Sequence, residues 1–182
     1  MANQIEKLNT IAPADIEKVN TLTDAQIEKI NTLEFAGISY TVATGGTITT
    51  DGDFKVHVFN SSGTFEVTTL GTDTSVTYLL VAGGAGGGGF AQAAGGGAGG
   101  YTTSSKAVTA TSYSVVIGAG GTGGNNSNVP GANGANSTWH SVTATGGGGG
   151  ASHSIGSGQN GGCGGGSTAL RGTFGTGSQG GD

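Results

Sequence analysis

The sequence has few charged residues and no long apolar stretch. Charged residues make up 9% of the 182 residues, and the formal net charge is −5. Because acidic residues outnumber basic ones and no basic patch occurs, nucleic acid is not an expected partner. The apolar residues between positions 76 and 98 are interrupted by glycines, so they do not form the run of about 20 apolar residues that a membrane helix needs. No signal-peptide pattern follows Met1, and we therefore expect a protein that does not use the Sec route.

Side chains that could support catalysis or bind a metal are also scarce. Cys163 is the only cysteine, so it has no partner for a disulfide or a thiolate metal site. His57, His140 and His153 match no metal-ligand spacing. No Asp or Glu occurs between positions 83 and 181, so a nucleophile-histidine pair there would lack an orienting carboxylate. The sequence predicts no enzyme activity, no metal site and no cofactor.

Two short motifs resemble binding sites but have simpler explanations. Residues 84–89 follow a strand-like segment and match the glycine spacing of a dinucleotide-binding loop, yet neither a helix nor an acidic residue follows them. Asp51 and Asp53 flank Gly52, but two carboxylates are too few ligands for a calcium loop. We interpret residues 51–53 as a hairpin turn.

Residues 1–37 contain a repeat with a period of 11 residues. The sequence Ile-Glu-Lys recurs, and each copy continues through Asn-Thr to Ile or Leu. One interpretation is a continuous helix in a right-handed supercoil. Pro13 and the capping sequence from Thr23 to Gln26 instead favour short helices, which are not stable alone. We predict an attachment or oligomerisation segment, the alternative being a small helical cap on the chain's own domain. Its apolar contacts would come from Ile5, Ile16, Ile27, Leu22 and Leu33.

Residues 38–82 change to an alternating pattern. Apolar and polar residues alternate from Phe54 to Phe59, between two groups of turn residues, as in a half-buried strand. Short segments rich in threonine and branched residues show similar character at positions 40–43, 47–50, 64–67 and 77–81. The pattern predicts a small antiparallel β-sandwich that holds most of the conventional core.

Residues 83–182 are dominated by glycine. Of the 41 glycines, six precede position 83 and 35 lie within residues 83–182, whereas Lys106, Arg171 and Asp182 are the only charged residues of this segment. Such a composition is typical of a flexible linker. However, strand-like segments at positions 101–108, 113–117 and 139–145 separate the glycine tracts. We therefore predict polyglycine-II-like runs that pack side by side and form hydrogen bonds through their peptide groups. The predicted fold is mainly β, with domains at residues 1–37, 38–82 and 83–182.

The order of these blocks resembles the glycine-rich domain of bacteriophage tail fibres and tail-tip adhesins. The residues that carry the resemblance lie at positions 46–67, 78–84, 95–101, 113–121 and 143–150. The N-terminal repeat also resembles repeats of phage structural proteins. The resemblance implies a virion protein on the exterior of the tail or capsid, forming a homotrimer and bound to other virion proteins through its N-terminal repeat. It also implies loops that contact a glycan or an outer-membrane protein of the host.

Two other functions are compatible with the sequence. One is a purely architectural subunit, such as a capsid decoration or a head fibre. The other is an ice-binding protein, because packed glycine helices can present a flat, uncharged face.

Aromatic and apolar side chains between the glycine tracts are the candidates for receptor contact. Rigid aromatic side chains supply contact area at a low entropic cost. Tyr101 and Trp139 have packing within the bundle as an alternative role. By composition, residues 125–136 and 151–160 are the predicted loops. The predicted contact residues are Phe90, Tyr101, Trp139, His140, His153 and Ile155, and Leu170 and Phe174 are further side chains of this kind.

Overall fold

The computed structural model describes residues 39–125, 128–169 and 172–179. The chain divides into two compact units, residues 1–38 and residues 39–182. The helical repeats predicted for residues 1–37 lie outside the described residues, and so do Ile5, Ile16, Ile27, Leu22 and Leu33. The fold described below is that of the second unit.

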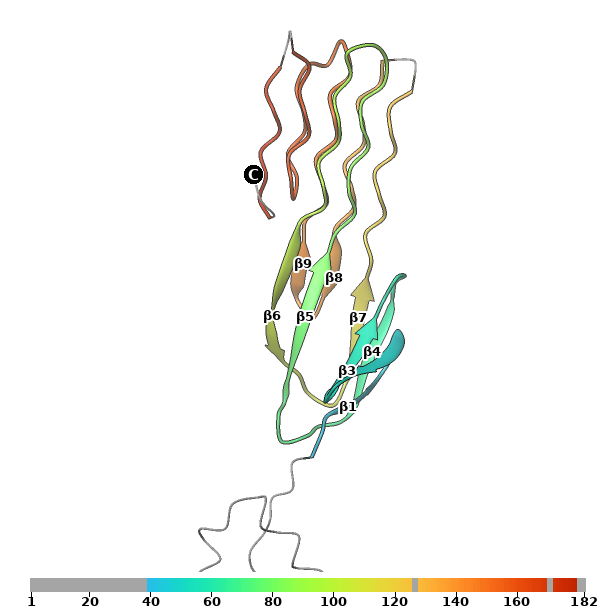
Figure 1. Ribbon diagram of the computed structural model, residues 1–182, viewed down its shortest axis with the longest axis vertical. Coiled ribbons are helices and arrows are strands. Elements are labelled where there is room, and N and C mark those ends of the chain that lie inside the picture. The colour runs from blue at the N-terminus through green and yellow to red at the C-terminus, as the bar shows by residue number, and fades with distance from the viewer. Residues whose placement is uncertain (1–38, 126–127, 170–171, 180–182) are drawn as a thin grey trace, which may run out of the picture. The chain divides into compact units, whose positions relative to one another are not determined.

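Short strands form one part of this unit, and extended segments without regular sheet pairing form the other (Figure 1). Each strand-like segment of the sequence overlaps a strand, and no helix occurs among the described residues. The prediction of a mainly β fold is therefore confirmed for this unit. The strands are β1 (Val42–Thr44), β2 (Thr47–Asp51), β3 (Phe54–Val58), β4 (Gly63–Thr69), β5 (Ser75–Val81), β6 (Tyr101–Ala107), β7 (Ser112–Val116), β8 (Ser137–Trp139) and β9 (Val142–Ala144).

The strands form one larger sheet and two hairpin-like pairs. The larger sheet has five strands in the order β1-β4-β7-β8-β9, whereas β2 pairs with β3 and β5 pairs with β6. All of these pairs are antiparallel. Strands from beyond position 100 thus complete the sheet that β1 and β4 begin. The predicted boundary after Ala82 falls inside this single unit, because both sides of it contribute to the same sheets.

The hydrophobic core lies between the five-stranded sheet and the β5–β6 pair. Phe65, Val115 and Trp139 from the sheet and Leu80 from β5 belong to one buried cluster. The Trp139 ring centroid lies 6.0 Å from that of Phe65 and 5.3 Å from that of Tyr78. Such aromatic pairs stabilise a core beyond the area that they bury. The core therefore joins segments that are far apart in the sequence.

The β2–β3 hairpin faces this core with the polar side of its alternation. Phe54 is 74% exposed, and Val56 and Val58 are also exposed. His57 points the other way, with its ring centroid 5.2 Å from that of Phe65 and its Nδ1 2.8 Å from the Gly45 carbonyl oxygen. The alternation predicts a half-buried strand, but β3 is exposed at every residue except His57, and its apolar residues lie on the outer face.

The segment at positions 139–145, predicted as one strand, is in fact a hairpin. Strand β8 ends at Trp139, and β9 begins at Val142, with Trp139 opposite Val142. His140 and Ser141 form the turn and both have a left-handed backbone, with φ of +42° and +62°. Two-residue turns of this kind usually carry Asn-Gly or Asp-Gly. The prediction was wrong because His-Ser lacks that signal.

A short loop precedes β5, and the side chain of Asp73 stabilises it through hydrogen bonds. Its Oδ1 accepts hydrogen bonds from the Ser75 backbone N–H at 2.9 Å and from the Ser75 hydroxyl at 2.8 Å. These bonds, the backbone one first, hold the pKa of the exposed Asp73 carboxyl below its usual value. The loop thereby fixes the start of the strand that leads into the first glycine segment.

Glycine-rich segments continue from the ends of the strands and run beside one another (Figure 1). Run 1 follows β5, run 2 leads into β6, run 3 follows β7, run 4 leads into β8 and run 5 follows β9. Runs 1 to 5 are therefore each held in place at one end by a strand. The runs are run 1 (82–89), run 2 (94–100), run 3 (117–125), run 4 (129–136), run 5 (145–152), run 6 (156–162), run 7 (163–168) and run 8 (172–179), and together we call them the bundle.

Backbone hydrogen bonds join neighbouring runs at every third residue. Run 1 shows the pattern clearly. Its N–H groups at positions 82, 85 and 88 donate to run 2, and those at positions 83, 86 and 89 donate to run 4, with N···O distances between 2.8 and 3.0 Å. Run 3 donates to run 1 in the same way, from Gly121 to Gly84 and from Gly124 to Gly87. A spacing of three residues turns successive peptide groups toward different neighbours, so each run can bind several others.

Run 5 occupies the interior of the bundle. It exchanges hydrogen bonds with runs 1, 2, 4, 6 and 7, and Gly146–Gly150 are all buried. A Cβ atom added at Gly149 would lie 1.9 Å from the Gly131 carbonyl oxygen, and one at Gly147 would lie 2.1 Å from that of Gly97. Close backbone neighbours from five runs leave no room for side chains, which explains why this run contains five glycines in succession.

On the side of run 5 where no further run lies, asparagine side chains of run 4 accept hydrogen bonds from its N–H groups. The Gly149 N–H donates to Oδ1 of Asn133 at 2.7 Å, and the Gly146 N–H donates to Oδ1 of Asn136 at 2.8 Å. These two asparagines lie three residues apart on run 4, the same spacing as the backbone bonds. An unpaired buried N–H is costly, so the asparagines replace the carbonyl groups of a missing neighbour.

Candidate functional site

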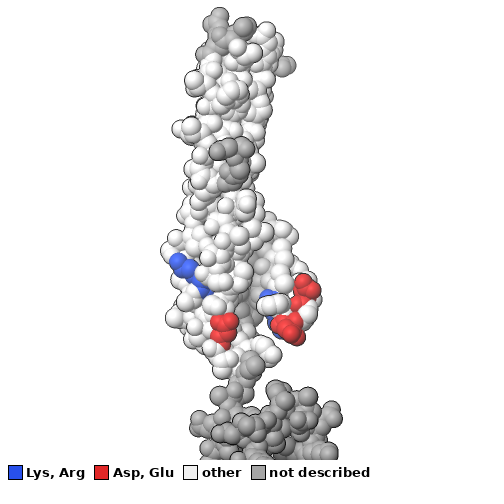
Figure 2. Space-filling view, turned by 60° about the vertical axis from the view of Figure 1, so that its left-hand side comes forward, with Lys and Arg blue, Asp and Glu red and all other residues white. Residues whose placement is uncertain are grey.

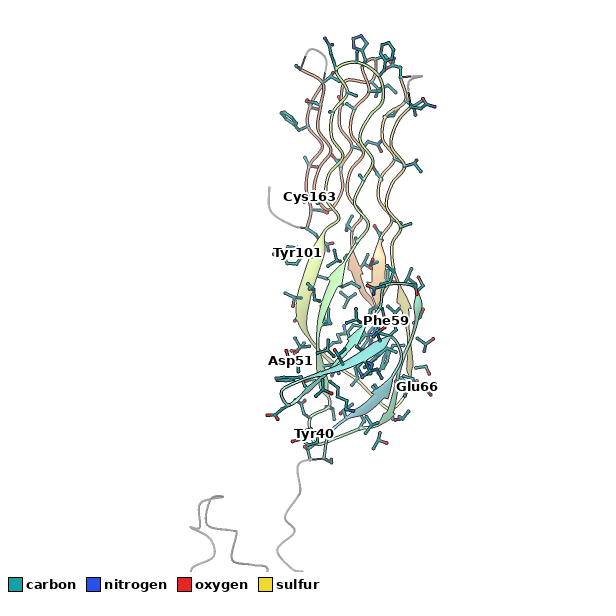
Figure 3. All side chains as sticks on the ribbon, turned by 45° about the vertical axis from the view of Figure 1, so that its right-hand side comes forward. Tyr40, Asp51, Phe59, Glu66, Tyr101 and Cys163 are labelled. Atoms are coloured by element: carbon teal, nitrogen blue, oxygen red, sulfur yellow. The ribbon has the colours of Figure 1, made fainter. Side chains whose placement is uncertain are left out.

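The side chains of the unit are dense over the strands and at the far ends of the runs, and sparse between them (Figure 3). The residues predicted to contact a receptor divide between these places. Phe90, His153 and Ile155 lie in the connections between runs, whereas Trp139 and His140 lie at the β8–β9 hairpin. Tyr101 begins β6, between the two, and is 56% exposed.

The distal loops are the connections at the ends of the runs that face away from the strands. They comprise residues 90–93 between runs 1 and 2, Asn128 before run 4, and residues 153–155 between runs 5 and 6. The Phe90 and His153 rings make an edge contact, with centroids 6.1 Å apart. The Ser154 N–H donates to Oδ1 of Asn128 at 3.0 Å, and the Asn128 side-chain N–H donates to the Ser154 hydroxyl. Three separate connections are thereby held together.

Several residues of the distal loops have a left-handed backbone although they are not glycines. The φ angles are +74° at Phe90, +62° at Gln92 and +63° at Asn128. This conformation costs free energy for residues with a Cβ, and such strain is concentrated at functional sites. In a chain with 41 glycines, side chains at these positions point to a role for the side chains themselves.

The surface near the distal loops is apolar and carries no charge among the described residues. Phe90, Ile155 and Val129 are between 45% and 55% exposed, and Phe174 in run 8 is 75% exposed. Lys106 in β6 is the only charged residue that the structure describes beyond position 82. Figure 2 shows coloured charges only over the strands. Exposed apolar side chains that gather in one place are typical of a surface that binds another molecule.

Trp139 is not available for a surface contact. It is 7% exposed and packs in the core, so of its two interpretations packing is the one that the structure supports. The His140 ring packs at a tilt on that of Tyr113, with ring centroids 4.4 Å apart, and its Nε2 lies 2.9 Å from the Ala107 carbonyl oxygen. Both side chains therefore serve to hold the β8–β9 hairpin in place.

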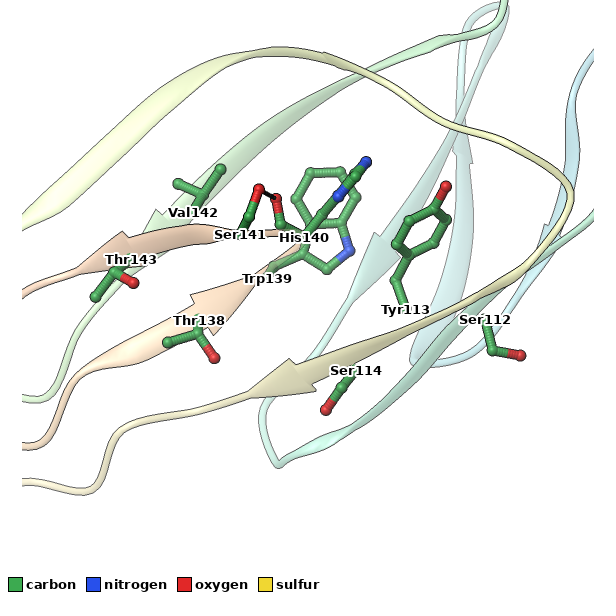
Figure 4. A pocket seen from close by; sticks show the side chains of 9 residues that line it. All are labelled: Ser112, Tyr113, Ser114, Thr138, Trp139, His140, Ser141, Val142 and Thr143. Carbon is green, nitrogen blue, oxygen red and sulfur yellow. Dashed lines mark hydrogen bonds between the residues drawn. The ribbon is translucent and has the colours of Figure 1, made fainter.

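A shallow hollow of about 450 Å³ lies at this hairpin (Figure 4). It is lined by the turn at His140 and Ser141 and by residues of β7, β8 and β9. Lys106 donates from Nζ to the Ser141 hydroxyl at 3.3 Å. None of the lining residues is acidic, so the hollow holds no carboxylate that could act as a general base or orient His140.

The loops predicted from composition were too long. Residues 129–136 and 156–160 belong to runs 4 and 6, where their backbone groups bind neighbouring runs. Of the two predicted loops, only Asn128 and residues 153–155 are described parts of the distal loops. Val129 and Gln92 were not predicted as site residues, because neither an isolated valine nor a glutamine beside alanines carries a sequence signal.

The three histidines do not come together. His57 contacts Phe65, His140 contacts Tyr113, and His153 contacts Phe90. Within the described ranges, no three His, Cys, Asp or Glu residues gather as metal ligands would.

The part of the chain that the structure describes also contains no helix of the length and apolar character needed to cross a membrane. Cys163 is half-buried at the start of run 7, where its carbonyl oxygen accepts a hydrogen bond from the Gly148 N–H.

Residues 60–182 match the family model described as a glycine-rich domain. This match covers more than half of the chain. The chain belongs to the glycine-rich domain family. Comparisons with curated proteins and with solved structures gave no match. The glycine-rich domain, as matched, contains β4 to β9 and all of the runs, so it includes both the five-stranded sheet's inner strands and the distal loops.

Proposed function

We propose that this protein is a structural component of a bacteriophage virion, of the tail-fibre or tail-tip adhesin type, that contacts the host cell surface. In this proposal the runs are polyglycine-II helices, the N-terminal repeat joins other virion proteins, and the chain forms a homotrimer. The distal loops contact a glycan or an outer-membrane protein of the host. The observation that carries the proposal is the placement of strained, exposed aromatic loops at the end of a bundle joined by backbone hydrogen bonds.

The bundle supports this function because it separates the two ends of the unit. Residue 39 enters next to β1, at the end occupied by the strands, whereas Phe90 and His153 lie beyond the far ends of the runs. A bundle with few side chains along its length and many at one end suits the presentation of loops at a distance from the attachment point. Backbone hydrogen bonds join each run to several others, and they keep the distal loops in a fixed arrangement.

The composition of the distal loops favours contact with an uncharged surface. Phe90 and Ile155 offer apolar area, and Asn128 and Ser154 offer hydrogen-bonding groups already fixed by one another. Exposed charges interact over about 8 Å at physiological ionic strength, so binding through uncharged groups depends little on salt. The proposed contact is therefore one of shape and apolar burial.

A binding assay with bacterial envelopes tests the proposal. The purified full-length chain, fluorescently labelled, is titrated onto a panel of envelopes from different bacteria, and a Phe90→Ala/Ile155→Ala variant is compared with it. Loss of two central apolar contacts weakens a typical interface by at least about 2 kcal/mol, or about 30-fold. The matched control is Phe54→Ala, which removes an exposed aromatic ring from β3, outside the distal loops. Equal binding by all three chains, or binding to no envelope of the panel, would contradict the proposal.

A further inference from the structure

The chain contains two Asn-Gly steps, and both lie within the bundle. Asn133–Gly134 is in run 4, and Asn160–Gly161 is in run 6. Asn-Gly is the dipeptide most prone to spontaneous deamidation, because a glycine places no side chain in the path of the reacting groups. The glycine nitrogen attacks the side-chain carbonyl carbon, Cγ, of the asparagine. Both asparagines are exposed, so burial does not protect them from this reaction.

In Asn133–Gly134, run 5 holds both reacting groups. The Asn133 Oδ1 accepts a hydrogen bond from the Gly149 N–H at 2.7 Å. The Gly134 nitrogen, which would be the nucleophile, donates to the Gly147 carbonyl oxygen at 2.9 Å. Attack requires the nitrogen to turn toward Cγ, so its bond to the Gly147 carbonyl oxygen must break, and the bond to Gly149 restrains the side chain that carries Cγ.

In Asn160–Gly161, a single residue of run 8 makes the same pair of bonds. The Thr176 N–H donates to Oδ1 of Asn160 at 2.8 Å. The Gly161 N–H donates to the Thr176 carbonyl oxygen at 3.1 Å. Two Asn-Gly steps in different runs are therefore restrained by the same arrangement, in which a neighbouring run binds the side-chain oxygen and the nucleophilic nitrogen together.

We propose that Asn133 and Asn160 are deamidation sites gated by the bundle, inert while the runs are packed and reactive once they separate. The reaction needs only water. The glycine nitrogen bonds to Cγ, the side-chain amide leaves as ammonia with the proton of the glycine nitrogen, and a five-membered succinimide forms. Water then opens either carbonyl of the ring, giving aspartate or isoaspartate. This inference goes beyond the proposed function and holds whether or not the distal loops bind a host.

The two products affect the bundle differently. Aspartate at position 133 keeps an oxygen that can accept the Gly149 N–H bond. Isoaspartate instead adds a methylene group to the main chain. On run 4 the bonds of Gly131 and Ala132 to runs 5 and 3 are repeated three residues later by Gly134 and Ala135. An added backbone atom between these two sets breaks the three-residue spacing, so a chain carrying isoaspartate does not repack.

The test follows deamidation site by site in the full-length chain. The protein is incubated at mildly alkaline pH, with and without guanidinium chloride, and the peptides containing Asn133 and Asn160 are analysed by mass spectrometry. We expect both sites to react at least about tenfold more slowly without denaturant, which corresponds to an opening free energy of about 1.4 kcal/mol or more. Equal rates with and without denaturant would overturn the proposal.

Two sets of variants separate gating from a general effect of the solvent. Gly86→Ala places a Cβ 2.1 Å from the Thr122 carbonyl oxygen and should loosen the bundle, whereas Gly123→Ala has 3.7 Å of space. We expect faster native-state deamidation in Gly86→Ala and an unchanged rate in Gly123→Ala.

A second experiment tests the irreversible step. After a long exposure to denaturant, refolded wild-type protein should lose slow-exchanging glycine amides in proportion to its isoaspartate content. Asn133→Gln/Asn160→Gln protein, which forms no succinimide, should recover them, and equal losses in both proteins would refute the irreversible step.

Discussion

At the residue scale, the position of each glycine decides whether it can be replaced. Gly147 and Gly149 are surrounded by backbone atoms of other runs, whereas a Cβ at Gly120 or Gly123 would find only ordinary contacts, at 3.6 and 3.7 Å. Outer runs accordingly carry alanine, threonine or asparagine at every third position, as in the sequence from Gly131 to Asn136. The composition of a run thus reflects how many neighbours it has.

The asparagines of run 4 provide a prediction at this scale. Asn133→Ala/Asn136→Ala leaves the Gly146 and Gly149 N–H groups, both buried, without their acceptors. Each unsatisfied donor costs about 1–3 kcal/mol. We therefore expect the free energy of unfolding, measured by denaturant titration, to fall by about 2–6 kcal/mol. Asn133→Asp, which retains the acceptor, is the control and should remain close to the wild type. A double alanine variant as stable as the wild type would show that these bonds are dispensable.

Side chains at this scale were only partly predictable from the sequence. Phe90, His153 and Ile155 lie at or next to exposed loops as expected, because an isolated large residue between glycine tracts has no core to enter. Trp139 does have a core to enter, which is made by Phe65 and Tyr78 from strands that lie more than 50 residues earlier. The role of Asn133 depends on which run lies beside it, and no local sequence pattern indicates which run that is.

At the element scale, the strands were predictable and their partners were not. Alternation and turn residues located each strand-bearing segment, yet β4 pairs with β7 across a separation that includes runs 1 and 2. The β8–β9 hairpin was missed because its turn, at His140 and Ser141, lacks glycine and asparagine. Pairing between distant segments is set by the joint burial of Phe65, Val115 and Trp139, which no single segment encodes.

Packing between runs provides a prediction at the element scale. Gly86→Ala forces a methyl group against the Thr122 carbonyl, which cannot move without breaking the hydrogen bond from Ala132. Overpacking of this kind costs about 1–3 kcal/mol, and the lost hydrogen bond adds about 1 kcal/mol. Gly123→Ala has space for its methyl group and restricts the unfolded chain, so it should change stability by less than about 1 kcal/mol. Thermal unfolding of the two variants side by side measures the difference, and similar melting temperatures would contradict the packing described above.

At the scale of the whole unit, the bundle has hydrogen bonds between the peptide groups of neighbouring runs where other domains have an apolar core. The strands contain the conventional core, and the runs contain almost no large buried side chain among the described residues. The near-absence of charge beyond position 82 fits this arrangement, because long charged side chains would keep the runs apart. The strand-like segments between the glycine tracts predicted that the runs pack, whereas the order in which they pack and the interior position of run 5 required the structure.

Site-resolved hydrogen exchange of the full-length chain tests the central claim, that backbone hydrogen bonds make the runs a rigid body. The Gly147, Gly148 and Gly150 N–H groups donate to runs 1 and 7, and the Val67 N–H donates to Thr111 within the strand-containing part. We predict that the three glycine amides exchange as slowly as that of Val67, because both sets open only when the unit unfolds. Glycine amides that exchange at the rate of an unfolded chain, while Val67 stays protected, would contradict this account.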